Sequence, residues 1–254
     1  MKVLLFPLAL FFIISTPSLA QKTIKAAEIV RQINAGESVR YENAIIEGEL
    51  DLTDLENQTS KKKGDSWFGD SNKQYESTVE NSIVFIKCRF KDNVLAYYSD
   101  NNNTYIAHFE GDVVFRSCVF DRQSEFKYSN FEEVADFSRC VFSREANFKY
   151  AEFEDGPDFS SSIFEEAANF KYTKFKDQPD YAHTVFEEEA NFKYANFPEG
   201  VDFESAIFNS LANFKYTKFS SPLNIDNVSF NGHEDFKYTS VDGKEFTTYL
   251  TRKR

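Results

Sequence analysis

The most regular feature of the chain is a series of aromatic residues at alternating intervals of five and six. From Phe126 the series runs through Phe131 and Phe137 and continues to Val241, and it extends backward to Phe85. In all, 24 of the 29 Phe residues lie on it. The residue two places before each aromatic is usually small, as Ala146 is before Phe148. Two side chains separated by one residue lie on the same face of a strand. The pattern therefore predicts short strands that point one large and one small side chain inward.

A pentapeptide recurs with the same register. Ala-Asn-Phe-Lys-Tyr occupies residues 146–150, 168–172, 190–194 and 212–216, so each copy begins 22 residues after the last. Four short segments per 22 residues predict a square coil, and parallel-strand hydrogen bonds would stack such coils ~4.8 Å apart. The predicted fold class is an all-β solenoid in which equivalent residues form ladders along the axis.

These units resemble those of pentapeptide-repeat proteins, as in Ala146-Asn147-Phe148-Lys149-Tyr150. The resemblance implies a right-handed quadrilateral parallel β-helix. It covers residues 79–241 strongly and 44–58 weakly. The chain departs from the plain pattern because its coils have 22 residues instead of 20, and this difference concerns the corners rather than the fold.

The remaining segments predict an exported protein with a covered first coil. Residues 1–20 have the pattern of a signal peptide, with an apolar run too short to span a membrane. We expect a mature protein, periplasmic or extracellular, without stable membrane insertion. Residues 21–43 form an N-terminal segment with a helix at 23–35 that caps the stack. The β-helix spans 44–241, and residues 242–254 form a tail.

Two insertions, near residues 58–76 and 91–103, interrupt the solenoid. The interval from Phe90 to Thr104 exceeds the regular spacing by 8 residues. If Ile46 shares a wall with Val79, the first coil has 11 extra residues. Both surpluses can leave at the same corner on neighbouring coils. Loops on a rigid scaffold commonly bind partners, and the candidate binding residues here are Trp67, Phe68, Tyr97 and Tyr98; alternatively, these aromatics pack back on the wall.

Lysine and tyrosine form two adjacent outward ladders, and the candidate binding residues are Lys149, Tyr150, Lys171, Tyr172, Lys193 and Tyr194. Such a surface could hold an extended anionic polymer with cation–π support. The favoured interpretation is a solubilising face whose lysines deter edge pairing. The acidic clusters at 132–133, 165–166 and 187–189 could neutralise it.

Three further ladders have two interpretations each. Aspartates 136, 158, 180 and 202 could bind Ca²⁺ or act as an acid/base pair, but more simply bond turn backbone. Cysteines 88, 118 and 140 should line one inner wall as small fillers, although export permits a disulfide between the last two. An outward stripe of branched residues at 119, 141, 163, 185 and 207 suggests a partner surface or ordinary β propensity.

Composition narrows the function. The formal net charge of −12 argues against a protein that binds nucleic acid by neutralising phosphates. We predict no catalytic residue, metal site or cofactor, and hence a non-enzymatic scaffold for an unknown protein or glycan, with a possible homodimer through a β-helix end or the apolar stripe. The family resemblance also implies a DNA mimic that binds a topoisomerase, which the signal peptide argues against. A β-helix polysaccharide-active enzyme would need a unique carboxylate or basic site.

Overall fold

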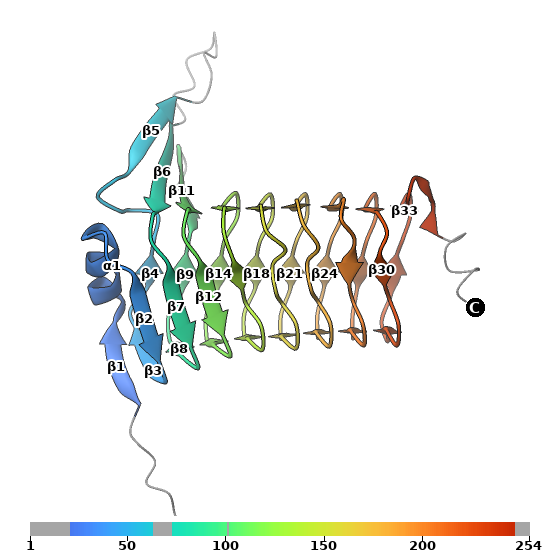
Figure 1. Ribbon diagram of the computed structural model, residues 1–254, viewed down its shortest axis with the longest axis horizontal. Coiled ribbons are helices and arrows are strands. Elements are labelled where there is room, and N and C mark those ends of the chain that lie inside the picture. Colours follow the sequence, from blue (N-terminus) through green and yellow to red (C-terminus); the bar gives the residue numbers. More distant parts are fainter. Residues whose placement is uncertain (1–20, 63–72, 101, 247–254) are drawn as a thin grey trace, which may run out of the picture.

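The computed structural model describes residues 21–62, 73–100 and 102–246. The predicted signal peptide and residues 247–254 of the predicted tail lie outside the described residues. Figure 1 shows the chain wound into a straight stack of coils, each of which crosses four walls. Strands of successive coils pair in parallel along every wall, which confirms the predicted quadrilateral β-helix.

The walls are numbered in chain order. Wall 1 contains β2 (Val39–Glu42), β7 (Ile83–Ile86), β12 (Val113–Arg116), β16 (Ala135–Asp136), β26 (Val201–Asp202) and β30 (Leu223–Asn224). Wall 2 contains β1 (Lys22–Lys25), β3 (Ala44–Glu47), β8 (Arg89–Phe90), β13 (Val119–Phe120), β17 (Val141–Phe142), β20 (Ile163–Phe164), β23 (Val185–Phe186), β27 (Ile207–Phe208) and β31 (Ser229–Phe230).

The other two walls complete each coil. Wall 3 contains β4 (Leu50–Asp51), β9 (Val94–Leu95), β14 (Ser124–Glu125), β18 (Ala146–Asn147), β21 (Ala168–Asn169), β24 (Ala190–Asn191), β28 (Ala212–Asn213) and β32 (Glu234–Asp235). Wall 4 contains β6 (Lys73–Val79), β11 (Asn103–Phe109), β15 (Asn130–Phe131), β19 (Glu152–Phe153), β22 (Lys174–Phe175), β25 (Asn196–Phe197), β29 (Lys218–Phe219) and β33 (Ser240–Val241). Three strands pair antiparallel at its margins: β5 (Thr59–Lys62), β10 (Tyr97–Ser99) and β34 (Lys244–Glu245).

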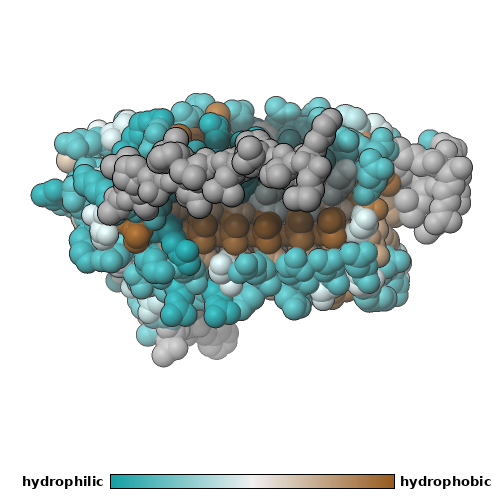
Figure 2. All heavy atoms as spheres, turned by 90° about the horizontal axis from the view of Figure 1, so that it is seen from below, coloured by the Kyte–Doolittle hydropathy of each residue, from teal (hydrophilic) through white to brown (hydrophobic). Residues whose placement is uncertain are grey.

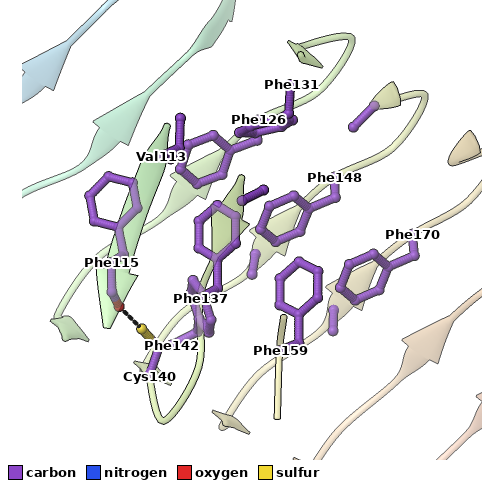
Figure 3. Close-up of a cluster of buried hydrophobic side chains, with 14 of the residues drawn as sticks. Val113, Phe115, Phe126, Phe131, Phe137, Cys140, Phe142, Phe148, Phe159 and Phe170 are labelled. Atoms are coloured by element: carbon purple, nitrogen blue, oxygen red, sulfur yellow. Dashed lines mark hydrogen bonds between the residues drawn. The ribbon is translucent and has the colours of Figure 1, made fainter. Parts of the chain in front are cut away.

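Aromatic rings fill the space between the walls. On wall 2, the rings of Phe142 and Phe164 lie 4.7 Å apart and within 2° of parallel. Rings from walls 1 and 3 interleave instead: Phe148 meets Phe137 at 78° and Phe159 at 80°, as Figure 3 shows. Stacked and edge-to-face contacts are both favourable for aromatic pairs. These rings are fully buried, so the column forms a continuous apolar core.

The first coil is covered by a strand and a helix. The helix α1 (Ala26–Asn34) begins later than predicted, because Lys22–Lys25 pairs with β3 as strand β1 and extends wall 2. Ala26 and Ile29 of the helix are buried in the core, and Gly36 follows the helix with a φ of 70° that favours glycine. Within the described ranges, no helix is long and apolar enough to cross a membrane.

Both insertions leave the stack at the corner between walls 3 and 4. Strand β6 pairs in parallel with β11 over seven residues, from Lys73–Asn103 to Val79–Phe109. Strand β5 pairs antiparallel with β6, and β10 pairs antiparallel with β11. The four strands form a ribbon that projects beyond the coils at this corner, and Figure 1 shows β5 and β6 standing out from the stack.

The first insertion is longer than the sequence count predicts. Ile46 pairs with Phe90 on wall 2, whereas Val79 pairs with Phe109 on wall 4, so the assumption that Ile46 and Val79 share a wall is wrong. From Leu52 to Val79 the chain takes 27 residues where regular coils take 5, a surplus of 22 instead of 11.

The second insertion begins later than predicted. Val94 pairs with Ser124 on wall 3, and both Val94 and Ala96 are fully buried. Residues 91–96 therefore continue the coil, and the 8 extra residues fall between Ala96 and Phe109. A count based on aromatic residues misses this boundary because aliphatic residues occupy two inward positions.

Candidate functional site: the lysine–tyrosine corner and the adjoining hollow

At the corner between walls 3 and 4, each regular coil makes the same four-residue turn. In the turn at 148–151, the carbonyl of Phe148 accepts a hydrogen bond from the Ala151 N–H at 3.0 Å. The side-chain Oδ1 of Asn147 accepts a hydrogen bond from the Lys149 N–H at 3.2 Å. Asparagine favours such turns because its side chain bonds the backbone two residues on. The asparagine of the repeat therefore holds the turn that carries lysine and tyrosine outward.

The tyrosine of this turn has a left-handed backbone. Its φ lies between 61° and 64° in all six coils that carry it: Tyr128, Tyr150, Tyr172, Tyr194, Tyr216 and Tyr238. That conformation costs a residue with a β-carbon about 1–2 kcal/mol. At the other tight corner, between walls 1 and 2, the equivalent positions hold Arg139, Ser161 and His183. The turn itself therefore does not require tyrosine.

The tyrosine rings of successive coils stack on one another. Successive tyrosine rings lie 4.7–4.9 Å apart, and the ring planes of Tyr172 and Tyr194 are parallel. The adjacent lysine Nζ lies 5.0–5.6 Å from the ring centroid of its tyrosine in every coil. We call this surface the Lys–Tyr ladder, and its lysines are Lys127, Lys149, Lys171, Lys193, Lys215 and Lys237.

The positive charges of the ladder are not neutralised between coils. Elsewhere, opposite charges meet across the coil spacing, as in Lys174–Glu152 at 2.5 Å and Lys176–Glu154 at 2.6 Å. Among the residues that the structure describes, no carboxylate forms an ion pair with a ladder lysine. Partial burial and then the like charges of neighbouring lysines lower the pKa of Lys149.

Among the described residues, the acidic clusters form no ion pair with the ladder lysines. Residues 132–133 follow wall 4, and residues 165–166 and 187–189 lie between walls 2 and 3, so both groups belong to the long corners of the coil. There they find other partners: Glu166 pairs with Arg144, and Glu187 accepts a hydrogen bond from Asn209 at 2.7 Å. The Lys–Tyr ladder remains a line of like charge on a protein of net charge −12.

A polar hollow of about 690 Å³ adjoins the first rung of the ladder. It is lined by Glu49, Asp51, Asn93, Leu95, Tyr97, Tyr98, Ser99, Gln123, Glu125, Lys127 and Asn147. The Nζ of Lys127 donates a hydrogen bond to the Tyr97 hydroxyl at 3.0 Å, and the Tyr97 ring lies 5.8 Å from that of Tyr128. The hollow and the Lys–Tyr ladder therefore form one continuous surface.

Glu125 is the unusual titratable group of the hollow. Burial raises its pKa to about 7, although the side-chain amide of Asn147 donates a hydrogen bond to its carboxylate at 2.9 Å. Sequence reasoning did not select this residue. The sequence feature that could have identified it is a departure from the repeat: the next four coils carry asparagine at the position of Glu125.

The candidate residues proposed from the sequence fall into three groups. Trp67 and Phe68 lie outside the described residues. Tyr97 and Tyr98 lie on β10 and line the hollow, where Tyr98 is 50% exposed. The lysine–tyrosine pairs occupy consecutive rungs of the ladder, and the structure joins these pairs to Tyr97 through the first rung: Lys149, Tyr150, Lys171, Tyr172, Lys193 and Tyr194.

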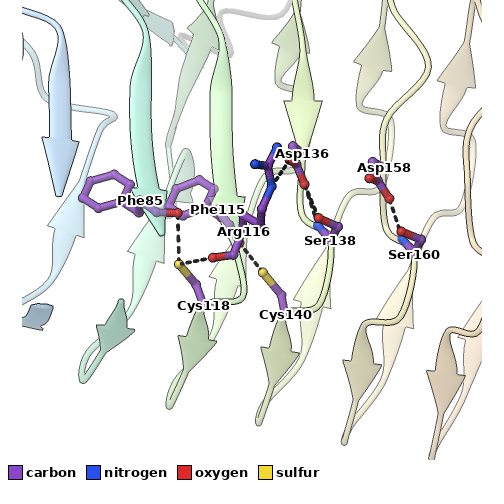
Figure 4. Close-up of polar contacts among 9 residues, drawn as sticks. All are labelled: Phe85, Phe115, Arg116, Cys118, Asp136, Ser138, Cys140, Asp158 and Ser160. Atoms are coloured by element: carbon purple, nitrogen blue, oxygen red, sulfur yellow. Dashed lines mark hydrogen bonds and ion pairs between the residues drawn. The ribbon is translucent and has the colours of Figure 1, made fainter. Parts of the chain in front are cut away.

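The aspartate ladder holds turn backbone. Asp158 Oδ1 accepts a hydrogen bond from the Ser160 N–H at 2.8 Å, and Asp180 makes the same bond to Ala182 at 2.7 Å. Asp136 also pairs with Arg116, whose Nε lies 2.9 Å from the carboxylate (Figure 4). No three or more His, Cys, Asp and Glu side chains are grouped to hold a metal ion within the described part of the chain.

The three cysteines are buried free thiols that serve as donors at the tight corner between walls 1 and 2. The thiol of Cys118 donates to the carbonyl of Phe85 at 3.3 Å, and that of Cys140 donates to the carbonyl of Phe115 (Figure 4). Ser162 makes the equivalent bond in the next coil at 2.7 Å. Cys118 and Cys140 are therefore free thiols bonded to backbone carbonyls and not joined by a disulfide.

Two apolar surfaces lie away from this corner. Figure 2 shows an apolar row along one face, which corresponds to the stripe on wall 2 whose middle residue, Ile163, is 36% exposed. At the end of the stack, a hollow of about 330 Å³ is lined mainly by aromatic and aliphatic side chains, and Phe230 there is 38% exposed. The ring of Phe246 covers part of this end by packing 4.4 Å from that of Phe236.

Comparison with known proteins agrees with the geometry of the coils. The family model for pentapeptide repeats, nine copies in length, matches residues 126–174 and 170–218. Residues 126–218 of the β-helix are therefore pentapeptide repeats. No curated protein and no solved structure matches the chain.

Proposed function

We propose that the mature protein is an exported, non-enzymatic scaffold that binds a protein or a glycan at the corner between walls 3 and 4. One observation carries this proposal: the projecting ribbon, the polar hollow and the Lys–Tyr ladder all meet at this corner. The coils beneath supply a rigid base, because every rung is held by backbone hydrogen bonds to its neighbours. Export is inferred from the signal-peptide pattern of residues 1–20.

The chemistry of the hollow suits recognition rather than turnover. It combines two tyrosine rings with amide, carboxylate and ammonium groups, the mixture that fixes the orientation of a polar ligand. The aspartate ladder, the other candidate for chemistry, bonds turn backbone in successive coils. The hollow also has the carboxylates of Glu49, Asp51 and Glu125, so release of products from a polysaccharide would favour an enzyme over this proposal.

Binding at the hollow is tested with a glycan array and with crosslinking to proteins of the exported fraction. The variant Tyr97→Ala/Tyr98→Ala removes both rings from β10 and should abolish the signals of the wild type. Tyr238→Ala is the matched control, because it removes an aromatic ring that is 61% exposed at the far end of the ladder. Equal binding by the wild type and the β10 variant would count against the hollow as the binding site.

Two further measurements test the rest of the proposal. Cell fractionation should find the mature chain outside the cytosol, and retention there would contradict export. Incubation with polysaccharides should release no products; turnover that is lost in Asp158→Asn would show an enzyme, because asparagine keeps the turn acceptor but not the carboxylate.

A further inference from the structure

We infer that the Lys–Tyr ladder binds a linear acidic polysaccharide with one carboxylate per sugar, laid along the axis of the stack; this rests on the proposed binding function and names its ligand. The first reason is charge. Six ammonium groups are held in one line without carboxylate partners among the described residues, on a protein of net charge −12. Like charges at this spacing repel one another, and an anionic chain would remove that repulsion.

The second reason is spacing. The rungs repeat every 4.7–4.9 Å, as the tyrosine rings show. One sugar of an extended 1,4-linked pyranose chain advances about as far as one rung. Because successive sugars are rotated about the chain axis, the carboxylates on one side of the chain recur every second or third rung, and they stay in phase with the lysines. An extended peptide places side chains of one face about 6.6 Å apart and would fall out of phase within a few rungs. Duplex DNA carries one charge per roughly 1.7 Å of its axis, which also mismatches the ladder.

The third reason is the arrangement of hydrogen-bond donors. Each ladder asparagine uses its Oδ1 for the turn, so that its side-chain amide N–H groups point to other partners. Asn147 and Asn191 donate to Glu125 and Glu189, while Asn169 and Asn213 have no side-chain amide partner among the described residues. Their amides lie on wall 3 beside the lysines, where they can donate to sugar hydroxyl or carboxylate oxygens.

The tyrosines act as spacers in this arrangement. Within the ladder, each ring face is covered by the ring of the next coil, for example at 4.7 Å between Tyr150 and Tyr172. A sugar therefore cannot stack on these faces, and recognition falls to the lysines and amides. The rings fix the height of each ammonium group through the cation–π contact.

The test is isothermal titration of the full mature chain with polygalacturonate. We expect binding at low ionic strength that weakens as salt is added, because exposed ion contacts are screened. The variant Lys149→Gln/Lys171→Gln/Lys193→Gln should lose about tenfold in affinity, equivalent to about 1.4 kcal/mol. Its fold should persist, since the turn bonds use the lysine N–H groups and not their side chains.

Matched controls distinguish specific binding at the Lys–Tyr ladder from nonspecific electrostatic attraction. Lys174→Gln/Lys176→Gln/Lys218→Gln removes the same charge from wall 4 and its margin and should bind like the wild type. Fully methyl-esterified polygalacturonate should not bind. The inference is overturned if polygalacturonate does not bind, if the control variant loses as much affinity, if the methyl ester binds equally, or if poly-L-glutamate binds more tightly.

The outcomes also distinguish this inference from the proposed function. Suppose that a neutral glycan or a protein binds the wild type but not Tyr97→Ala/Tyr98→Ala, and that polygalacturonate does not bind. That result would support the scaffold function and contradict the acidic polysaccharide as its ligand. If the wild type bound no ligand in either assay, both the proposed scaffold function and the acidic ligand would be contradicted.

Discussion

The ring of Phe170 lies 5.1 Å from that of Phe148 in the preceding coil, with 1° between the two planes. The same residue meets Phe159 and Tyr181 edge-on from wall 1, at 81° and 84°. Phe170 is fully buried in the middle of the column. It therefore touches rings above, below and across the core, so the column depends on this side chain for its packing.

Replacement of this ring should leave a cavity. We expect Phe170→Ala to lower the free energy of unfolding by about 3–5 kcal/mol, measured by urea denaturation. Val134→Ala, at a position that is 47% exposed, serves as the control and should change it by less than about 0.5 kcal/mol. A loss for Phe170→Ala well below about 1 kcal/mol would contradict the buried column.

A substitution at Tyr181 should instead stabilise the protein. Its ring continues the column of wall 1, 5.1 Å from Phe159, but its hydroxyl is buried without a hydrogen-bond partner among the described residues. Burial raises the pKa of this tyrosine well above its usual value, so the hydroxyl stays neutral. Tyr181→Phe should raise the free energy of unfolding by about 1 kcal/mol, because it removes an unsatisfied polar group.

The control is Tyr194→Phe, whose side chain is 37% exposed and should be neutral within about 0.5 kcal/mol. Comparable thermal or urea unfolding of Tyr181→Phe and the wild type would mean that the Tyr181 hydroxyl has a partner in solution.

Glu125 should make stability depend on pH. Burial raises its pKa from 4.5 to about 7, so between these values the folded state holds a proton that the unfolded chain has released. The free energy of unfolding should therefore fall as pH rises from about 4.5 to about 7. Glu125→Gln should remove this part of the pH dependence and be more stable than the wild type above pH 7.

The measurement is the unfolding midpoint of both proteins across this range. Glu188→Gln removes an exposed carboxylate three coils away, at the corner between walls 2 and 3, and should keep the wild-type slope. Identical slopes for the wild type and Glu125→Gln would show that Glu125 is ionised in the folded protein at neutral pH.

Cys140 should be replaceable by serine but not by valine. Serine can make the same bond to the carbonyl of Phe115 that Ser162 makes to Phe137 at 2.7 Å in the next coil. Valine fills a similar volume but cannot donate, so Cys140→Val should cost about 1 kcal/mol more than Cys140→Ser in urea denaturation. A valine variant as stable as the serine variant would show that packing alone decides this position.

Much of the fold could be predicted because its repeat is strict. The five-and-six spacing of Phe126 to Phe236 places each aromatic inward, and the strands pair at the same 22-residue offset. The prediction fails where residues without rings take inward positions. Val94 and Ala96 are fully buried in their coil, but they lack the aromatic ring that marks the repeat.

The candidate site was harder to predict because it depends on neighbours across coils. The aromatic pair Tyr97–Tyr98 was visible in the sequence, but the hollow exists only because β10 overhangs wall 3. The ion pairs around the ladder could not be read from the sequence for the same reason. Acidic residues are close to the lysines in sequence, as Glu166 is to Lys171, yet wall 3 lies between them and Glu166 pairs with Arg144.

The constant 22-residue offset also makes the molecule modular in length. Deletion of residues 149–170 would join Phe148 to Lys171 and remove one complete layer. The strand at 146–147 would lose its partner at 168–169 but could pair with the equivalent strand at 190–191, and every remaining strand would keep its inward face. A deletion of one residue fewer would reverse the inside and the outside of the walls that follow. Gene duplication or loss of whole layers could thus lengthen or shorten the row of lysines without disturbing either end of the protein.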